Sequence, residues 1–370
     1  MFKNLKLNNK LLRRLDYSII IVVILLVAFS IINIYSATHI NNGIYYAKLQ
    51  FFWLIIGLVT MYGIILVDYN IILSYANIIY WGSVIFLALN DFVLGSNVNG
   101  ATGWISIGSR AIQPSEFAKL GMILMLAKVI QEMDGNINNI KSIAKIMFYS
   151  AVPMLLIVIQ PDMGMTMVSF FIILAIVIVA NVDWRIIVGG LSFIFISVVI
   201  LWNSPIMPSY WKGRLVSFLK PEQFELTFGL QLLQSKIAIG SGGIFGLGFL
   251  NGKQYRFVPE NHTDFIFAVI GEEWGLVGAL ILLVLYGILL YKLINIAKTS
   301  KDMAGSVLCA GIIGGIIFSI IQNMGMTIGL MPITGITLPF VSYGGSSMLT
   351  NFIALGLILN VGMRRKKINF

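Results

Sequence analysis

The sequence predicts an all-α, polytopic integral membrane protein with about ten transmembrane helices, both termini in the cytoplasm, and one large extracytoplasmic loop between spans 7 and 8. Of the 370 residues, 58% are hydrophobic and only 11% are charged, whereas soluble domains carry about 25% charged residues. Apolar stretches long enough to cross a bilayer, roughly 20 residues each, recur along the chain. This composition excludes a cytosolic enzyme, a secreted domain and a disordered binding protein.

The apolar stretches give the predicted spans in order. They cover residues 17–36, 49–67, 71–94, 114–131, 145–160, 163–180, 184–202, 264–293, 303–325 and 341–361. The first stretch follows basic residues, as in a signal peptide, but its apolar part exceeds the usual length of about 7–15 residues. We therefore expect it to be an uncleaved first span.

The net charge is +10, and many of the basic residues lie near the two ends of the chain. The flanking cations are Lys3, Lys6, Lys10, Arg13, Arg14, Arg364, Arg365, Lys366 and Lys367. Positive charge beside membrane spans stays in the cytoplasm, so both termini should lie there and the number of spans should be even. This placement also argues against a nucleic-acid partner, and the single Cys309 excludes an intrachain disulfide.

Residues 203–263 form the only long polar segment, and we expect them to be the extracytoplasmic loop of a single domain covering residues 1–370. The loop contains three prolines, a charged run and a glycine-rich stretch. Loops of this length in compact proteins usually carry function.

The first polar group lies at the start of the fourth span. Pro114 suits the first turn of a helix, and Glu116 and Lys119 stand three residues apart, on one helix face. The pair is either a structural ion pair or a cation and carboxylate that face an anionic ligand. Asp162 follows Gln160 and Pro161, where turn chemistry alone explains an aspartate, although it falls at the same outer side.

The third polar group surrounds Asp264, at the transition from the loop into an apolar helix. Partial desolvation should raise the pKa of this carboxyl towards the range of a general base. Glu260 and Glu272 would share its helix face and Glu273 would point away, so we expect Glu272 to line the same cavity. The alternative is an acidic helix N-terminus that interacts with the helix dipole. His262 is expected to pack or donate hydrogen bonds.

Two glycine-rich segments cover residues 240–246 and 342–347. Neither is a dinucleotide fingerprint, because Phe245 stands where the third glycine is required. Each segment either forms a backbone nest for a phosphate group or permits turns and close helix packing.

Five blocks of sequence together resemble the SEDS (shape, elongation, division and sporulation) family, over about residues 16–361. The blocks are Gln113-Pro114-Ser115-Glu116 with Lys119, Gln160-Pro161-Asp162-Met163-Gly164, residues 234–243, residues 262–269 and residues 338–346.

The resemblance implies a bacterial peptidoglycan glycosyltransferase with ten spans, in the cytoplasmic membrane with its active site facing outwards, that polymerises lipid II. The amino-acid sequence of residues 234–269 is more similar to the elongation branch of the family than to the division branch. By position, Asp264 matches the family's essential aspartate, and Trp104, Glu116, Lys119 and Asp162 match other functional positions. Many members have a basic residue before the tryptophan, where this chain has Gly103; the role of that residue is then either vacant or filled by Arg110 or another cation.

The chemistry expected from these residues needs one base, because a pyrophosphate is already a good leaving group once cations neutralise it. Asp264 would deprotonate the acceptor hydroxyl. The expected substrate-binding residues are Trp104, Glu116, Lys119, Asp162, Arg214, Lys236, Glu272 and Ser342. A divalent cation, Mg²⁺ or Mn²⁺, is a further possibility.

The expected partners are lipid II, a class B penicillin-binding protein, other elongation-complex proteins and the membrane itself. Three alternatives stay open from the sequence: a lipid II flippase, a scaffold that only recruits a transpeptidase, and a polymerase of the division or sporulation type.

Overall fold

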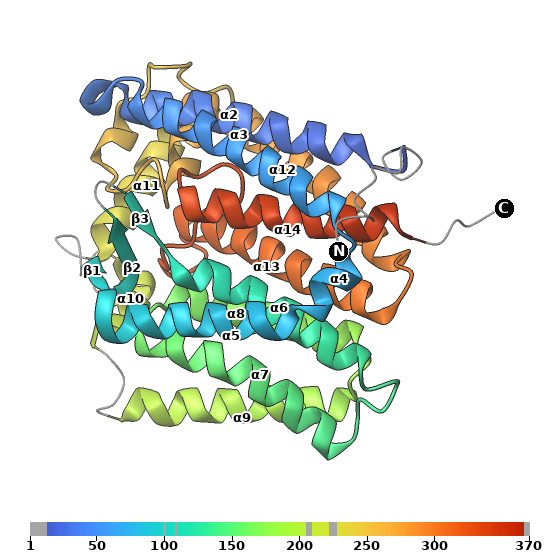
Figure 1. The fold of residues 1–370 in the computed structure, drawn as a ribbon. Helices are drawn as coiled ribbons and strands as arrows, with labels where there is room; N and C mark the ends of the chain where they lie inside the picture. Colours follow the sequence, from blue (N-terminus) through green and yellow to red (C-terminus); the bar gives the residue numbers. More distant parts are fainter. Residues whose placement is uncertain (1–12, 99–100, 108–109, 205–208, 222–227, 366–370) are drawn as a thin grey trace.

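The computed structural model describes residues 13–98, 101–107, 110–204, 209–221 and 228–365, and it is almost entirely helical (Figure 1). The long helices are α2 (Tyr17–Asn42), α3 (Tyr45–Leu66), α5 (Ala76–Leu89), α6 (Pro114–Gln131), α7 (Ile140–Ile159), α8 (Met163–Val179), α9 (Trp184–Asn203), α12 (Ile266–Lys298), α13 (Met303–Ile328) and α14 (Gly345–Met363). A short helix α4 (Tyr69–Ser74) precedes α5, and a π-helical turn (Asn90–Leu94) follows it. The all-α, polytopic prediction is confirmed.

Each predicted span overlaps one of these long helices. Eight helices of the described chain are long and apolar enough to cross a membrane. The other two predicted spans correspond to α6, which carries Glu116, Lys119 and Lys128, and to α8, which has 17 residues. The start of α2 and the end of α14 lie at one end of the bundle (Figure 1). The number of spans and their orientation stay predictions.

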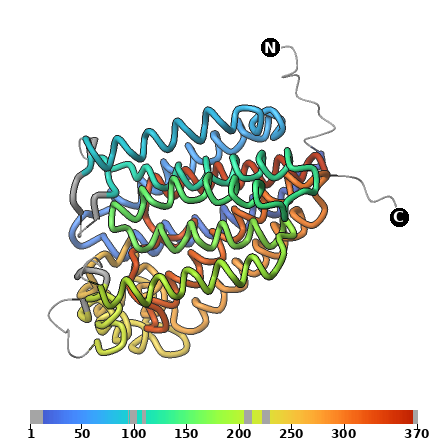
Figure 2. The backbone as a smooth tube through the Cα atoms, turned by 90° about the horizontal axis from the view of Figure 1, so that it is seen from below, coloured from blue at the N-terminus to red at the C-terminus, as the bar shows by residue number. Residues whose placement is uncertain are grey.

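Helices α13 and α14 form the centre of the bundle, and most of their residues are buried. The helices run side by side along one common direction (Figure 2). Gly311, Gly314 and Gly315 of α13 face Ile172, Ala175 and Ile176 of α8, where their lack of a side chain allows the close approach on which helix packing in lipid depends. Helix α9 has no buried residue and lies at the edge (Figure 1).

A small antiparallel sheet between α5 and α6 was not predicted. Its strands are β1 (Ser96–Val98), β2 (Ala101–Ile107) and β3 (Arg110–Ile112), in the order β1-β2-β3. The sheet covers the end of the bundle opposite the start of α2 (Figure 1). Strand β2 carries Trp104 to that end, paired with Ser96 of β1.

The long segment before α12 contains further helices, α10 (Ser209–Leu219), α11 (Phe228–Gly242) and a 3₁₀ turn (Gln254–Phe257). Its glycine-rich stretch packs against a break in α12 at Gly275, whose φ of 63° favours glycine. A Cβ atom on Gly242 would lie 2.0 Å from the carbonyl oxygen of Gly271. Close packing, rather than a phosphate nest, therefore accounts for this stretch.

The prediction that Glu272 lines the cavity of Asp264 is wrong. Its buried carboxylate accepts the backbone N–H groups of Lys253 and Gln254 on Oε1, at 2.6 and 2.8 Å, and of Tyr255 on Oε2, at 2.6 Å. The prediction placed Asp264 and Glu272 on one face of a continuous helix. That assumption fails because α12 begins at Ile266, after Asp264. Glu272 instead fixes the 3₁₀ turn against α12.

Replacing Glu272 with alanine should destabilise the protein strongly. The change leaves one buried and two partly buried N–H groups without their acceptors, and an unsatisfied buried donor costs about 1–3 kcal/mol. Thermal unfolding of the purified protein in detergent should show a melting temperature lowered by several degrees, whereas Glu132→Ala, at an exposed position after α6, should melt as the wild type does. Equal melting of Glu272→Ala and the wild type would contradict this structural role.

Candidate active site

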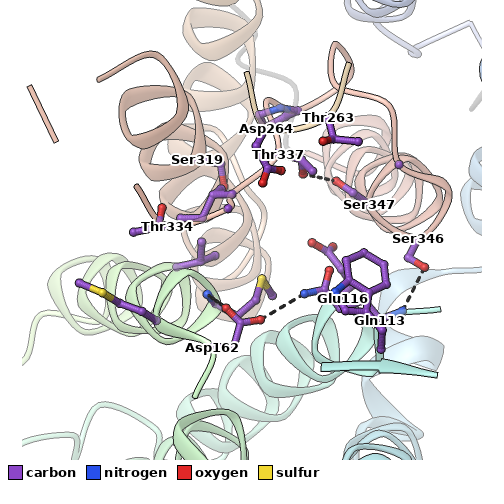
Figure 3. A pocket seen from close by; sticks show the side chains of 18 of the residues that line it. Gln113, Glu116, Asp162, Thr263, Asp264, Ser319, Thr334, Thr337, Ser346 and Ser347 are labelled. Carbon is purple, nitrogen blue, oxygen red and sulfur yellow. Dashed lines mark hydrogen bonds between the residues drawn. The ribbon is translucent and has the colours of Figure 1, made fainter. Parts of the chain in front are cut away.

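A cavity of about 210 Å³ opens between the loops at the end of the bundle that carries the sheet. Figure 3 shows that Asp162 and Asp264 lie on opposite walls. Six residues predicted from the sequence line this cavity: Trp104, Glu116, Lys119, Asp162, Arg214 and Asp264. They come from β2, α6, the start of α8, α10 and the segment before α12, so residues up to 160 positions apart meet in one place.

Glu116 and Lys119 form the predicted ion pair, with 2.6 Å between Lys119 Nζ and Glu116 Oε2. Thr350 of α14 donates its hydroxyl to the same oxygen at 2.5 Å. Pro114 occupies the first turn of α6, as expected. The pair joins α6 to α14, as the structural reading expects, and it also lines the cavity, where its role towards an anionic ligand stays a prediction.

Asp162 caps the N-terminus of α8, where its Oδ1 accepts the N–H of Met165 at 2.9 Å. Its Oδ2 accepts a hydrogen bond from Gln113 Nε2 at 3.2 Å. Burial raises the pKa of this carboxyl, while the Met165 N–H and the charge of Arg214 oppose that shift. The turn chemistry expected for Asp162 therefore coexists with a place in the cavity wall.

Asp264 differs from the other acids of the cavity. Its carboxylate accepts no hydrogen bond from any residue that the structure describes, whereas Glu116, Asp162 and Glu260 each accept at least one. It does not cap α12 either, because the cap position is Phe265. The two oxygens of Asp264 are therefore available to a ligand in the cavity.

The backbone around Asp264 is fixed by three donors from the segment 323–343. The N–H of Tyr343 binds the carbonyl of His262 at 3.0 Å, Ser342 Oγ binds that of Thr263 at 2.5 Å, and Asn323 Nδ2 binds that of Asp264 at 2.7 Å. Asn323 also binds the carbonyl of Ile336 at 2.7 Å. We name these three contacts the carbonyl clamp.

The pKa of Asp264 is raised to about 7. Burial is the main cause, the negative charges of Glu260 and Asp162 add to it, and the positive charge of Arg214 opposes it. An aspartate with this pKa is partly deprotonated at neutral pH and can accept a proton efficiently there.

Arg214 and Lys119 are the cations that line the cavity among the described residues. Arg214 Nη1 also donates to the carbonyl of Ile333 at 3.3 Å, which holds α10 against the loop before α14. These two cations face four lining carboxylates, those of Glu116, Asp162, Glu260 and Asp264.

Three predicted binding residues do not line the cavity. Glu272 holds the 3₁₀ turn, Lys236 is exposed on α11, and Ser342 is buried in the carbonyl clamp. The sequence reasoning named Gln113 and Glu260 without giving them a binding role, although both line the cavity, and it missed Asn323 and Thr350. Asn323 and Thr350 had a signal, because each is a polar residue inside a long apolar stretch. Arg110 lies in β3, and the structure does not describe its side chain.

The described residues do not fit a preformed metal centre. No three His, Cys, Asp or Glu side chains among them come together around a common point. Oε2 of Glu116 binds Lys119 and Thr350, and the two oxygens of Asp162 accept hydrogen bonds from Met165 and Gln113. A divalent cation stays a prediction.

Comparison with known proteins gives a consistent result. Residues 13–367 match the family model for FtsW, RodA and SpoVE, described as "Cell cycle protein". The chain is 36% identical to stage V sporulation protein E of Bacillus subtilis, over 94% of this chain and 96% of that protein. It is 33% identical to the peptidoglycan glycosyltransferase MrdB of Escherichia coli K12, over 96% and 95%.

A solved structure supports the same relationship. It is named "Structural coordination of polymerization and crosslinking by a peptidoglycan synthase complex", and it superposes with a TM-score of 0.82 at 30% identity, over 95% of this chain and 98% of its own. The resemblance to the SEDS family is thus confirmed, and the chain belongs to the FtsW, RodA and SpoVE family of multi-pass membrane proteins.

Proposed function

We propose that this protein is a peptidoglycan glycosyltransferase that polymerises lipid II into β-1,4-linked glycan strands. The observation that carries the proposal is Asp264, a carboxyl with a pKa of about 7 and no hydrogen-bond donor among the described residues, facing Lys119 and Arg214 across one cavity. Relatives named as peptidoglycan glycosyltransferases support it.

In the proposed reaction, the carboxylate of Asp264 takes the proton from the 4-hydroxyl of the acceptor N-acetylglucosamine. The oxygen then attacks the anomeric carbon of the donor N-acetylmuramic acid. The bond from that carbon to the pyrophosphate breaks, its electron pair leaves with the polyprenyl pyrophosphate, and the configuration inverts to β. One base suffices, because the leaving group needs charge stabilisation rather than protonation.

Lys119 and Arg214 would hold the pyrophosphate. The described lining has two cations and four carboxyls, which would repel an anion if every carboxyl were ionised. The pKa of Asp264, raised to about 7, removes part of that negative charge at neutral pH. Glu116 orients Lys119 through their ion pair.

An apolar groove of about 940 Å³ is suited to a polyprenyl tail. It runs between α3, α5, α6 and α14, with lining residues that include Ile64, Phe86, Phe117 and Leu357. Phe117 neighbours Glu116 on α6, so one helix presents its charged side to the cavity and an apolar side to the groove. A lipid-linked sugar could thus reach the cavity while its tail stays in the membrane.

The flippase alternative needs a polar path through the bundle. Below the main cavity, a small cavity of about 20 Å³ continues past Lys119, Ser319 and Asn351, and its remaining lining is Leu120, Ile123, Ile172, Ile312, Gly315, Ile316 and Ala354. The polar lining therefore stops there, which favours the polymerase.

Within the family, we place this protein in the elongation branch, on the sequence of residues 234–269. We further propose a class B penicillin-binding protein as its partner, in the cytoplasmic membrane and with the cavity facing outwards. The complex that couples polymerization and crosslinking in a 30% identical relative supports such a partner.

Asp264→Asn should abolish polymerisation of labelled lipid II by the purified protein. Loss of a general base lowers the rate by about 10²–10⁴-fold, while binding of lipid II should persist. The matched control is Asp134→Asn, at an exposed position after α6. Wild-type rates for Asp264→Asn would exclude the proposed mechanism, absence of product from the purified wild type would leave the scaffold alternative, and lipid II transfer across vesicles without product chains would establish the flippase.

The rate should depend on the protonation of Asp264. Because the base acts deprotonated, kcat/KM should fall about tenfold per pH unit well below pH 7 and level off above it. The negative charge of Glu260 raises the pKa of Asp264. In Glu260→Gln, the fall in kcat/KM should therefore begin at a lower pH. A pH profile with an unchanged or higher midpoint would show that Asp264 is not the titrating base.

Depletion of the protein in its own cells should give round cells, because growth along the cell sides stops while division continues. Light microscopy after depletion measures this directly. Filamentous cells, or normal rods that fail to form spores, would instead assign the protein to the division or sporulation branch.

A further inference from the structure

The cavity is smaller than the substrates that the proposed function requires. Its volume of about 210 Å³ lies below the range of about 300–1,000 Å³ typical of pockets that enclose a drug-sized ligand. A lipid-linked glycan chain and a second disaccharide do not both fit inside. Sugars beyond the reacting pair must therefore lie over the rim of the cavity. This inference rests on the proposed polymerase function.

Three aromatic rings meet at the rim beside Asp264. Tyr46 comes from the first turn of α3, His262 from the segment before α12, and Tyr343 from the loop before α14. The ring centroids of Tyr46 and His262 are 4.8 Å apart, those of Tyr46 and Tyr343 are 4.9 Å apart, and those of His262 and Tyr343 are 5.7 Å apart. We name these three residues the aromatic rim.

The aromatic rim is continuous with the reaction site. Tyr343 itself lines the cavity, and His262 precedes Thr263 and Asp264 in the chain, two residues that line the cavity (Figure 3). The backbone bond from Tyr343 N–H to the His262 carbonyl, one contact of the carbonyl clamp, fixes the two segments. All three side chains are partly exposed.

The chemistry of the rim suits a neutral sugar. Burial lowers the pKa of His262, so its ring is an uncharged aromatic at neutral pH. Aromatic faces carry partial negative charge and attract the polarised C–H groups on the flat face of a pyranose. Tyrosines are common at membrane interfaces, which accounts for the outward Tyr45 but not for three rings from distant segments that contact one another beside the cavity, which Tyr343 lines.

We propose that Tyr46, His262 and Tyr343 form a saccharide-binding subsite that holds the β-1,4-linked N-acetylhexosamine chain next to Asp264 between successive additions. A glycan chain that stays bound is extended again, whereas the growth of a released chain stops. Removing a stacking ring should therefore shorten the product.

The test measures glycan lengths made from labelled lipid II by the purified full-length protein, separated on a gel at low conversion. Tyr46→Ala and Tyr46→Leu should both shorten the mean chain about tenfold, because Leu keeps apolar volume but has no ring. Tyr46→Phe and Tyr46→Trp should keep chains near wild-type length. Tyr62→Ala removes the same side chain from an exposed position on the same helix and should change nothing.

Wild-type chain lengths for Tyr46→Leu would overturn the subsite, and so would equal shortening by Tyr62→Ala. Asp264→Asn in the same assay separates the two proposals. If that variant is inactive and the Tyr46 variants make chains of normal length, the subsite fails and the polymerase stands. If Asp264→Asn still makes chains, the assignment of the reaction fails whatever the lengths are.

Discussion

The carbonyl clamp is the constraint on which the site depends. Asp264 lies just before α12, where the chain leaves the helical hydrogen-bond pattern, and carbonyl groups without donors are costly in a bundle surrounded by lipid. The three contacts from Asn323, Ser342 and Tyr343 satisfy three successive carbonyls. The backbone is thus held without any donor touching the carboxylate, which leaves the acid both fixed in place and free to react.

The carboxylates near α12 are chemically alike but differ in their hydrogen-bond partners, and therefore in their roles. Glu272 accepts three backbone N–H groups and Glu273 accepts Ser36 and the N–H of Leu250, so both carboxylates hold the segment 250–255 in place. Among the acids near α12 that the structure describes, only Asp264 accepts no hydrogen bond on either carboxylate oxygen. The same contrast separates it from Asp162, whose two oxygens are used by the α8 cap and Gln113.

The sequence predicted the helical class and six of the lining residues, because long apolar stretches and polar residues at their ends are local signals. It failed where a tertiary contact decides the outcome. The face assigned to Glu272 assumed an unbroken helix from Asp264, but α12 starts two residues later and breaks at Gly275. Ser342 looked like a phosphate-binding serine in a glycine-rich turn, and its partner, the Thr263 carbonyl, is 79 positions away. The small sheet was missed although the sequence carries Asn99-Gly100 and Gly108-Ser109, two dipeptides typical of hairpin turns.

A cavity that ends within the bundle is what glycosyl transfer at one membrane face requires. Donor, acceptor and leaving group all keep their lipid tails on the same side, so no charge has to cross the bilayer during the reaction. Moving a pyrophosphate past the isoleucines below Lys119 would desolvate its charges, at an idealised cost on the order of 20 kcal/mol for a single ion. The groove beside α6 meets the other requirement, because it lets an apolar tail stay in lipid while the sugar reaches Asp264. The charged and apolar sides of one helix would thereby separate the two halves of the proposed substrate.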